Sequence, residues 1–483
     1  ASTVLLTGCG RRSALDPGEA VNVIVCIAAL VFLMFVAYRG FSVILFAPVA
    51  ALLAVLLTDP GLVLPMFTSV FMDKMVGFVK NYFPVFLLGA VFGKVIELSG
   101  FSKSIVAAVI SLVGRDRAML SIVLVGALLT YGGVSLFVVV FAVYPFAAEM
   151  FRQIGIPKRL VPGTIALGAF TFTMDSLPGT PQIQNIIPTT FFGTNTWAAP
   201  ILGTLGSLFI LLIGLLYLEF RRRQAAAAGE GYGEGHTNEP DAPTDERLPH
   251  PAIALLPLVV VGVMNIVLTR AIPAAYGATH EFQLEAMPKP VQTNVASVAA
   301  IWAVEGALLL GILTVLVFAF KAVSQRFAEG TRAAVSGSLL AAMNTASEYG
   351  FGGVIAALPG FLVIADGLRS IPNPLVNEAI TVTTLAGITG SASGGMSIAL
   401  AAMAEDFKAA ATAAGIPFEV LHRVASMASG GMDTLPHNGA VITLLAVTGL
   451  THRQSYGDIF AITCIKTMAV FFVIAVYYLT GLV

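Results

Sequence analysis

Charged residues are scarce in this sequence. Only 11% of the 483 residues are charged, whereas 57% are hydrophobic and the mean hydropathy is +0.88. A typical soluble domain is about 25% charged. A soluble fold of this length could not bury so much apolar surface, so the composition favours a chain that lies in a lipid bilayer. The formal net charge of −1 argues against a nucleic-acid partner.

Cysteine and the usual enzyme motifs are also nearly absent. The three cysteines Cys9, Cys26 and Cys464 are far apart, which suits neither a disulfide framework nor a zinc site. There is no phosphate loop, HExxH or dinucleotide fingerprint, so neither an enzyme nor a bound cofactor is expected. Residues 1–19 contain "LLTGCGRR", whose apolar stretch is too short for a signal peptide, and we expect a disordered N-terminus there.

Long apolar runs predict an all-α polytopic membrane protein, because a crossing helix needs about 20 apolar residues. Straight spans are expected near 20–38, 41–57, 82–98, 196–219, 251–271, 293–320, 346–364 and 455–480. Segments 61–80 and 322–345 are expected to be matching interfacial helices. Residues 221–250, rich in Gly, Pro, Ala and acidic side chains, predict a flexible cytoplasmic linker.

Four further apolar runs are interrupted. "MDSLPGTP" interrupts 157–193 and "MDTLPHNG" interrupts 416–450, while "YGGVS" and "GSASGGMS" interrupt 117–151 and 375–410. The first two predict broken helices and the last two predict re-entrant hairpins. Irregular backbone is tolerated at membrane depth only inside protein or beside a watery cavity.

The interruptions recur in the same order in residues 20–220 and 251–483, which predicts an internal duplication. Each half would have about five crossing helices, one re-entrant hairpin and one broken helix. Five crossings separate the two expected hairpins. An odd number places the second hairpin on the opposite face, so the repeats are predicted to be inverted, as in many secondary transporters.

The interruptions also predict a binding site. Broken helices expose N–H groups that can hold an anion and carbonyls that can hold Na⁺. The surrounding hydroxyl and amide side chains suit a small hydroxylated anion, and glycines let a ligand approach the backbone. The candidate binding residues are Gly133, Ser135, Ser393, Gly395 and Ser397 at the hairpin tips, and Thr180, Gln182, His437 and Asn438 in the unwound stretches.

Asp175 and Asp433 stand at equivalent places in the two breaks. A carboxylate at the bilayer centre costs about 2.5–3.5 kcal/mol. Each is expected either to carry the coupling proton or to cap a half-helix through backbone N–H groups. His437, whose counterpart is Gly179, is a further candidate for proton transfer or a structural residue. The weaker candidates are Lys94, Glu97, Glu305, Glu348, Glu378 and Lys466.

The hairpin tips "GGVS" and "GSASGGMS", followed by "MDSLPGTPQIQN" and "MDTLPHNGAV", resemble the gluconate permease family. That family falls within the ion transporter superfamily, with the citrate and dicarboxylate carriers. The resemblance implies proton-coupled uptake of gluconate, glycerate or 3-hydroxybutyrate by an elevator mechanism in a homodimer. Superfamily members have a scaffold domain and a moving transport domain with the hairpins and broken helices.

We therefore predict a secondary transporter of the bacterial inner membrane for a small organic anion, with lipid around it and the proton as coupling ion. The alternatives are a sodium-coupled carboxylate or citrate carrier, and a cation antiporter in which Asp175 and Asp433 bind the cation. An intramembrane enzyme with these residues as an acid pair is disfavoured, since catalysis needs no two-faced symmetry.

Overall fold

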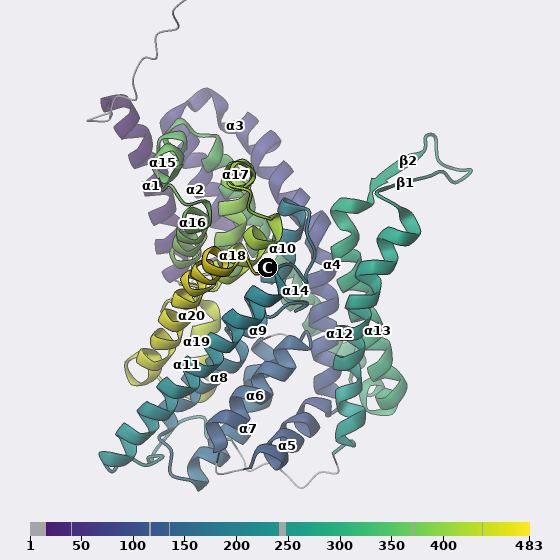
Figure 1. The fold of residues 1–483 in the computed structure, drawn as a ribbon, viewed down its shortest axis with the longest axis vertical. Coiled ribbons are helices and arrows are strands. Elements are labelled where there is room, and N and C mark those ends of the chain that lie inside the picture. The colour runs from purple at the N-terminus through teal and green to yellow at the C-terminus, as the bar shows by residue number, and fades with distance from the viewer. Residues whose placement is uncertain are drawn as a thin grey trace, which may run out of the picture.

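The computed structural model describes residues 16–39, 41–114, 117–134, 136–240, 248–369, 371–436 and 438–483. Within these ranges the fold is a bundle of helices with one small exposed hairpin of strands (Figure 1). Five helical segments are long and apolar enough to cross a membrane, or six if one bent pair counts as a single span. This agrees with the predicted polytopic helical fold.

The first half begins with α1 (Pro17–Tyr38) and α2 (Val43–Thr58). A long helical stretch follows, through η1 (Pro60–Leu62), α3 (Val63–Met66), the π-helical η2 (Phe67–Met72) and α4 (Asp73–Leu98). Then come α5 (Phe101–Val113), α6 (Ala118–Tyr131), α7 (Leu136–Gln153), η4 (Lys158–Leu160), α8 (Val161–Ala169), α9 (Phe172–Asp175), α10 (Ile183–Phe192) and α11 (Pro200–Ala227).

The second half begins with α12 (Pro251–Tyr276), β1 (Thr279–Phe282), β2 (Val291–Asn294) and α13 (Val295–Ser324). The strands pair antiparallel, with Thr279 opposite Asn294. The chain continues through α14 (Phe327–Ala357), α15 (Pro359–Arg369), α16 (Pro374–Thr389), α17 (Ala392–Ala413), α18 (Phe418–Ser429), α19 (Gly439–Thr448) and α20 (His452–Thr480).

The helices of the two halves interlock. α1 packs against α15 and α2 against α14, while α12 packs against α5 and α13 against α4. α4 also packs along α14, and α11 along α20. In Figure 1, α12 and α13 lie along one edge beside α4 and α14, and the short helices α9, α10 and α18 lie nearer the centre. The interrupted helices are therefore surrounded by protein.

The two segments predicted as interfacial helices do not form helices of their own. Residues 61–80 belong to the long helical stretch Pro60–Leu98, and 322–345 divide between the end of α13 and the first part of α14. Lys74 in the first segment and Asn81 just after it line a cavity between helices. Short helices occur instead at α5, which the sequence reading missed, and α15.

The predicted straight span 346–364 was also wrong. α14 and α15 meet at 88° around Leu358. Pro359 is the first residue of α15, where its missing N–H is harmless, and it disfavours helical backbone at the preceding residue. The small strand pair was not expected either.

The two polar segments are more ordered than predicted. α1 begins at Pro17, so the expected disorder of residues 1–19 fails for 17–19, and residues 1–15 lie outside the described chain. Residues 221–227 continue α11 instead of starting a flexible linker, because "RRRQAAA" consists of strong helix formers. Residues 241–247 are not described.

The linker beyond α11 is docked on the helices. The buried Lys158 forms a 2.6 Å ion pair with Glu239 and donates to the Thr237 carbonyl. Asn238 donates to the Ala446 carbonyl at the end of α19. Arg159 donates two 2.7 Å hydrogen bonds to Glu230. The linker therefore ties α7, α8 and α19 together at one end of the bundle.

Candidate functional site

The first break lies between α9 and α10, where residues 176–182 leave the helical path. Its backbone groups are satisfied by other protein groups: Gly179 N–H donates to the Thr196 carbonyl at 2.8 Å, and Asn265 donates to the Gly179 carbonyl at 3.0 Å. The buried Asn185 amide donates to the carbonyls of Thr180 and Thr196. This is the condition under which irregular backbone can exist at membrane depth.

The second break lies between α18 and α19, over residues 430–438. Side chains of α20 satisfy its carbonyls: Thr467 donates to Gly431 and Tyr456 donates to Thr434. The Thr434 and Thr463 hydroxyls lie 2.5 Å apart. α20 thus holds most of the second break in place.

Each hairpin tip is tied to a break by a side-chain amide. Gln182 precedes α10 and donates to the Thr130 carbonyl at the end of α6, at 2.7 Å. Asn438 precedes α19 and donates to the Gly390 carbonyl at the end of α16, at 2.8 Å. Gly390 ends α16 in the left-handed region, at φ 64°, where glycine is favoured. Hairpins and broken helices therefore form joined pairs.

These contacts involve two of the predicted binding residues, Gln182 and Asn438. Asn438 also caps α19, because its Oδ1 accepts from the N–H groups of Ala440 and Val441. Its side chain is thus engaged in the protein's own contacts, as is that of Gln182. The buried Thr180 hydroxyl donates to the Thr173 carbonyl at 2.7 Å. In this arrangement the three residues hold the breaks together.

The hairpin-tip residues are placed differently from one another. The Ser393 hydroxyl lies 3.2 Å from that of Thr345 on α14. The Ser397 hydroxyl is buried without a hydrogen-bond partner in the described ranges. A side chain at Gly395 would overlap the α16 backbone at Ala386, so this glycine permits close packing of the hairpin arms. That Gly395 also lets a ligand approach the backbone stays a prediction.

Gly133 is also closely packed, at the first hairpin. It adopts a φ of 94°, and a side chain there would come within 3.2–3.3 Å of Leu308 and Pro181. Ser135 and His437 lie outside the described residues.

Asp175 is a buried carboxylate with no ion-pair partner among the described residues. It is 2% exposed, and Ser176 donates to its Oδ1 at 2.8 Å. Gly430, in the second break, packs directly against its Oδ2. In the described chain no basic side chain reaches salt-bridge distance and no backbone N–H donates to this carboxylate. Asp175 ends α9 and therefore does not cap α10.

Asp433 differs from Asp175 because it has a counter-ion. Lys466 on α20 places its Nζ 2.5 Å from Asp433 Oδ1. The same Nζ donates to the Phe170 carbonyl, just beyond α8, at 3.1 Å. Lys466 therefore joins the second break to the first broken helix, a relationship that the sequence did not predict.

Sequence reasoning missed Arg423 and His422 altogether. The fully buried Arg423 donates to the Asp175 carbonyl at 3.1 Å and to the Ala198 carbonyl at 2.7 Å. His422 lies 2.6 Å from Thr194 Oγ1 and 3.1 Å from Asn185 Oδ1. The pair "HR" inside the apolar run before the second break was an available signal, because ionisable residues in membrane segments are rare and usually functional.

Glu348 forms a second buried carboxyl site, on α14. Gly394 at the start of α17 packs directly against its Oε2, which has no hydrogen-bond partner among the described residues. Glu348 is 4% exposed. The second hairpin tip thus lies against a carboxyl group that the sequence reading ranked low.

The sequence and the fold of the chain are both similar to those of known transporters. No family model matches the chain. The chain is 59% identical over 471 residues to the uncharacterized transporter YxjC of Bacillus subtilis (strain 168), covering 96% of this chain and 100% of that protein. It is similar in fold to the crystal structure of the Alcanivorax borkumensis YdaH transporter, with a TM-score of 0.56 over 96% of this chain and 99% of that one. The 15% identity of that pair limits the likeness to fold.

These relatives are transporters and not enzymes, in agreement with the sequence reading. The apolar helices are those of a multi-pass membrane protein. Membership of the gluconate permease family stays a prediction. At this identity and coverage, the chain belongs to the family of membrane transporters that includes YxjC.

Proposed function

We propose that this protein is a secondary transporter of the bacterial inner membrane that takes up a small hydroxycarboxylate together with protons. The acids intended are gluconate, glycerate or 3-hydroxybutyrate. The observation that carries the proposal is the pair of helix breaks, each with a buried aspartate and each tied to a hairpin tip by Gln182 or Asn438. Paired interruptions of this kind surround substrate and ion sites in secondary transporters.

The packing of the helices supports an inverted duplication. If α1 corresponds to α12, α2 to α13, α4 to α14 and α5 to α15, four contacts between the halves form two matching pairs. α1 meets α15 as α12 meets α5, and α2 meets α14 as α13 meets α4. A broken helix followed by α11, α12, α13 and α14 separates the two hairpins, so the number of crossings stays odd.

Charge supports a cytoplasmic linker. Arg152, Lys158 and Arg159 lie at the end of the bundle where the linker docks, and Arg221 extends from α11 to the same region. Basic residues beside membrane helices are enriched on the cytoplasmic side. With the linker inside, the first hairpin opens from the cytoplasmic face and the second from the other.

The asymmetry between the two aspartates supports Asp175 as the coupling residue. Lys466 forms an ion pair with Asp433, while the Ser176 hydroxyl is the one hydrogen-bond donor to the Asp175 carboxylate among the described residues. A carboxyl group within a membrane segment that lacks a counter-ion is the expected carrier for a proton. In our proposal, Asp175 takes up and releases the proton as the hairpins and broken helices move past α4, α13 and α14 in an elevator motion.

Uptake in proteoliposomes tests this function. We would measure labelled gluconate, glycerate and 3-hydroxybutyrate under an imposed inward proton or sodium gradient. The wild type should accumulate at least one acid with the proton gradient alone. Asp175→Asn should lose proton-driven accumulation and still exchange labelled for unlabelled acid across the membrane, because exchange needs no net proton movement.

The matched control is Asp59→Asn, which changes an exposed carboxylate that caps η1 and should leave uptake unchanged. Accumulation driven by sodium and indifferent to pH would favour the sodium-coupled alternative. Proton-driven accumulation that survives in Asp175→Asn would remove the coupling role from this residue.

A further inference from the structure

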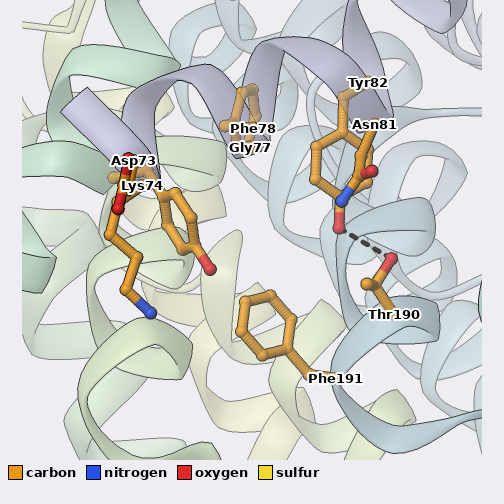
Figure 2. A pocket seen from close by; sticks show the side chains of 9 residues that line it. Asp73, Lys74, Gly77, Phe78, Asn81, Tyr82, Thr190 and Phe191 are labelled. Atoms are coloured by element: carbon orange, nitrogen blue, oxygen red, sulfur yellow. Dashed lines mark hydrogen bonds between the residues drawn. The ribbon is translucent and has the colours of Figure 1, made fainter. Parts of the chain in front are cut away.

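A small cavity of about 160 Å³, with aromatic walls and a few polar groups, lies between α4, α10 and α14, outside the two breaks (Figure 2). α10 belongs to the first broken helix, whereas α4 and α14 are long continuous helices. Figure 2 shows Lys74 and Tyr82 of α4 and Thr190 and Phe191 of α10 around this cavity. The cavity thus lies where a moving broken helix would meet the proposed scaffold.

Lys74 is held in this cavity without a counter-ion. Its aliphatic stem packs on Gly353 of α14, where an added side chain would come within 2.7 Å of Lys74 Cγ. Its ammonium lies 5.9 Å from the centre of the Tyr349 ring. Across the described residues, no carboxylate oxygen lies within salt-bridge distance of Lys74. The cavity therefore contains a positioned positive charge that a ligand could neutralise.

Two further polar groups of the cavity lack partners. The Asn81 amide and the Tyr349 hydroxyl make no hydrogen bond within the described ranges, although both residues line the cavity. Tyr82 and Thr190, by contrast, bond to each other at 2.9 Å. An ammonium, an amide and a phenol hydroxyl are together suited to a carboxylate and a nearby hydroxyl group.

The remaining walls are aromatic. The Tyr349 ring contacts Phe78, with centroids 5.7 Å apart, and Phe191, with centroids 6.2 Å apart. The volume is below the roughly 300–1,000 Å³ of sites for drug-sized ligands, so it suits a molecule of few carbons. The π-helical η2 ends directly before Asp73, and such stretches often occur at functional sites.

We propose that this cavity is a recognition site for a small hydroxycarboxylate, in which Lys74 binds the carboxylate and Asn81 and Tyr349 bind the hydroxyl group. Phe78 and Phe191 cover the carbon chain. This inference rests on the proposed transport of such acids and adds the site that selects them. It assigns recognition to α4, α10 and α14, and leaves proton coupling to the breaks.

Asp73 offers a test of whether the cavity binds an anion or a cation. Its exposed side chain lines the rim beside Lys74 and opposes an entering anion. Removing this charge by Asp73→Asn should therefore strengthen binding of a carboxylate. A cavity built for a cation would behave in the reverse way, losing its ligand in Asp73→Asn and binding it more strongly without Lys74.

The experiment combines ligand binding and uptake. Thermal unfolding of the purified full-length protein would be measured with 3-hydroxybutyrate, with butyrate, which lacks the hydroxyl, and with butanediol, which lacks the carboxylate. A ligand that binds the folded state raises the Tm by mass action. The wild type should respond most to the hydroxy acid. The variants are Lys74→Met, Lys74→Arg, Asn81→Ala and Tyr349→Phe, with Lys80→Met as the exposed control on the same helix.

Lys74→Met should raise the KM for 3-hydroxybutyrate uptake about 10-fold or more, since a charge-assisted contact is lost. It should also erase the preference for acid over butanediol, whereas Lys74→Arg should keep this preference. Asn81→Ala and Tyr349→Phe should erase the preference for the hydroxy acid over butyrate. Lys80→Met should match the wild type. If Lys74→Met does not fold, the preferences of the other two cavity variants decide the question.

The inference would be overturned if the cavity variants kept the wild-type KM and the wild-type preferences among 3-hydroxybutyrate, butyrate and butanediol. Weaker carboxylate binding in Asp73→Asn would also overturn it. A wild type that binds the hydroxy acid through Lys74 but accumulates no acid would retain the recognition site and refute the transport proposal. Accumulation that is independent of Lys74, Asn81 and Tyr349 would support the transport proposal and refute the recognition site.

Discussion

Lys466 Nζ lies 2.5 Å from the Oδ1 atom of Asp433, and both side chains are almost fully buried. The ammonium also binds the Phe170 carbonyl of the first broken helix. This buried ion pair therefore links the second break to the first broken helix. Asp175, at the equivalent place in the first half, has no such partner among the described residues. Two motifs with nearly the same sequence thus carry carboxylates with different electrostatic surroundings.

The ion pair should show strong coupling in stability. Asp433→Asn or Lys466→Met alone leaves a buried charge or a buried polar group without its partner, and each should lower the free energy of unfolding by about 3–5 kcal/mol. The double variant should recover most of this loss because no unpaired charge remains. Unfolding of the four proteins in detergent gives the coupling energy. Losses that simply add would show that the two side chains do not interact.

Gly430 should be intolerant of a side chain. Its backbone packs against Asp175 Oδ2, so Gly430→Ala would push the methyl group into the carboxylate and should lower stability by about 1–3 kcal/mol. Displacement of Asp175 should also lower proton-driven uptake. Gly439→Ala is the control: nothing lies within 4 Å of the added carbon, at the first residue of α19. Equal stability and uptake in the two variants would contradict this packing.

The stability that the linker contributes should decrease in acid. The Arg159 guanidinium, through its hydrogen bonds, holds the pKa of Glu230 below its usual value. A carboxyl with a lowered pKa in the folded state stabilises it above the unfolded pKa of about 4.3, and this contribution is lost as the pH falls through the folded value. The effect should be small, about 0–1 kcal/mol, because the pair is partly exposed.

The Tm of the wild type and of Glu230→Gln, measured between pH 7 and pH 3, checks this point. The wild type should have the higher Tm near pH 7, and the difference should shrink below about pH 4. Glu234→Gln, at an exposed position of the same linker, should follow the wild type at every pH. A difference that grows on acidification would show the opposite linkage.

Local sequence predicted the interruptions well. Pro178, Pro436 and the glycines beside them cannot continue a helix, so the breaks at 176–182 and 430–438 and the ends of α6 and α16 follow from the residues themselves. The same local signals located the apolar cores of α2, α11, α12, α13 and α20, because a run of about 20 apolar residues has few alternatives to a membrane helix.

What the polar residues do depends on contacts between distant helices. Lys74 and Asn81 line a cavity with residues of α10 and α14, because packing brings these helices together, and a sequence does not show which helices are neighbours. Whether a buried Asp has an ion-pair partner depends on residues distant in the chain: Lys466 pairs with Asp433, whereas Asp175 has no ion-pair partner among the described residues. Local residue chemistry therefore sets where the helices break, and long-range packing sets which charges meet at the breaks.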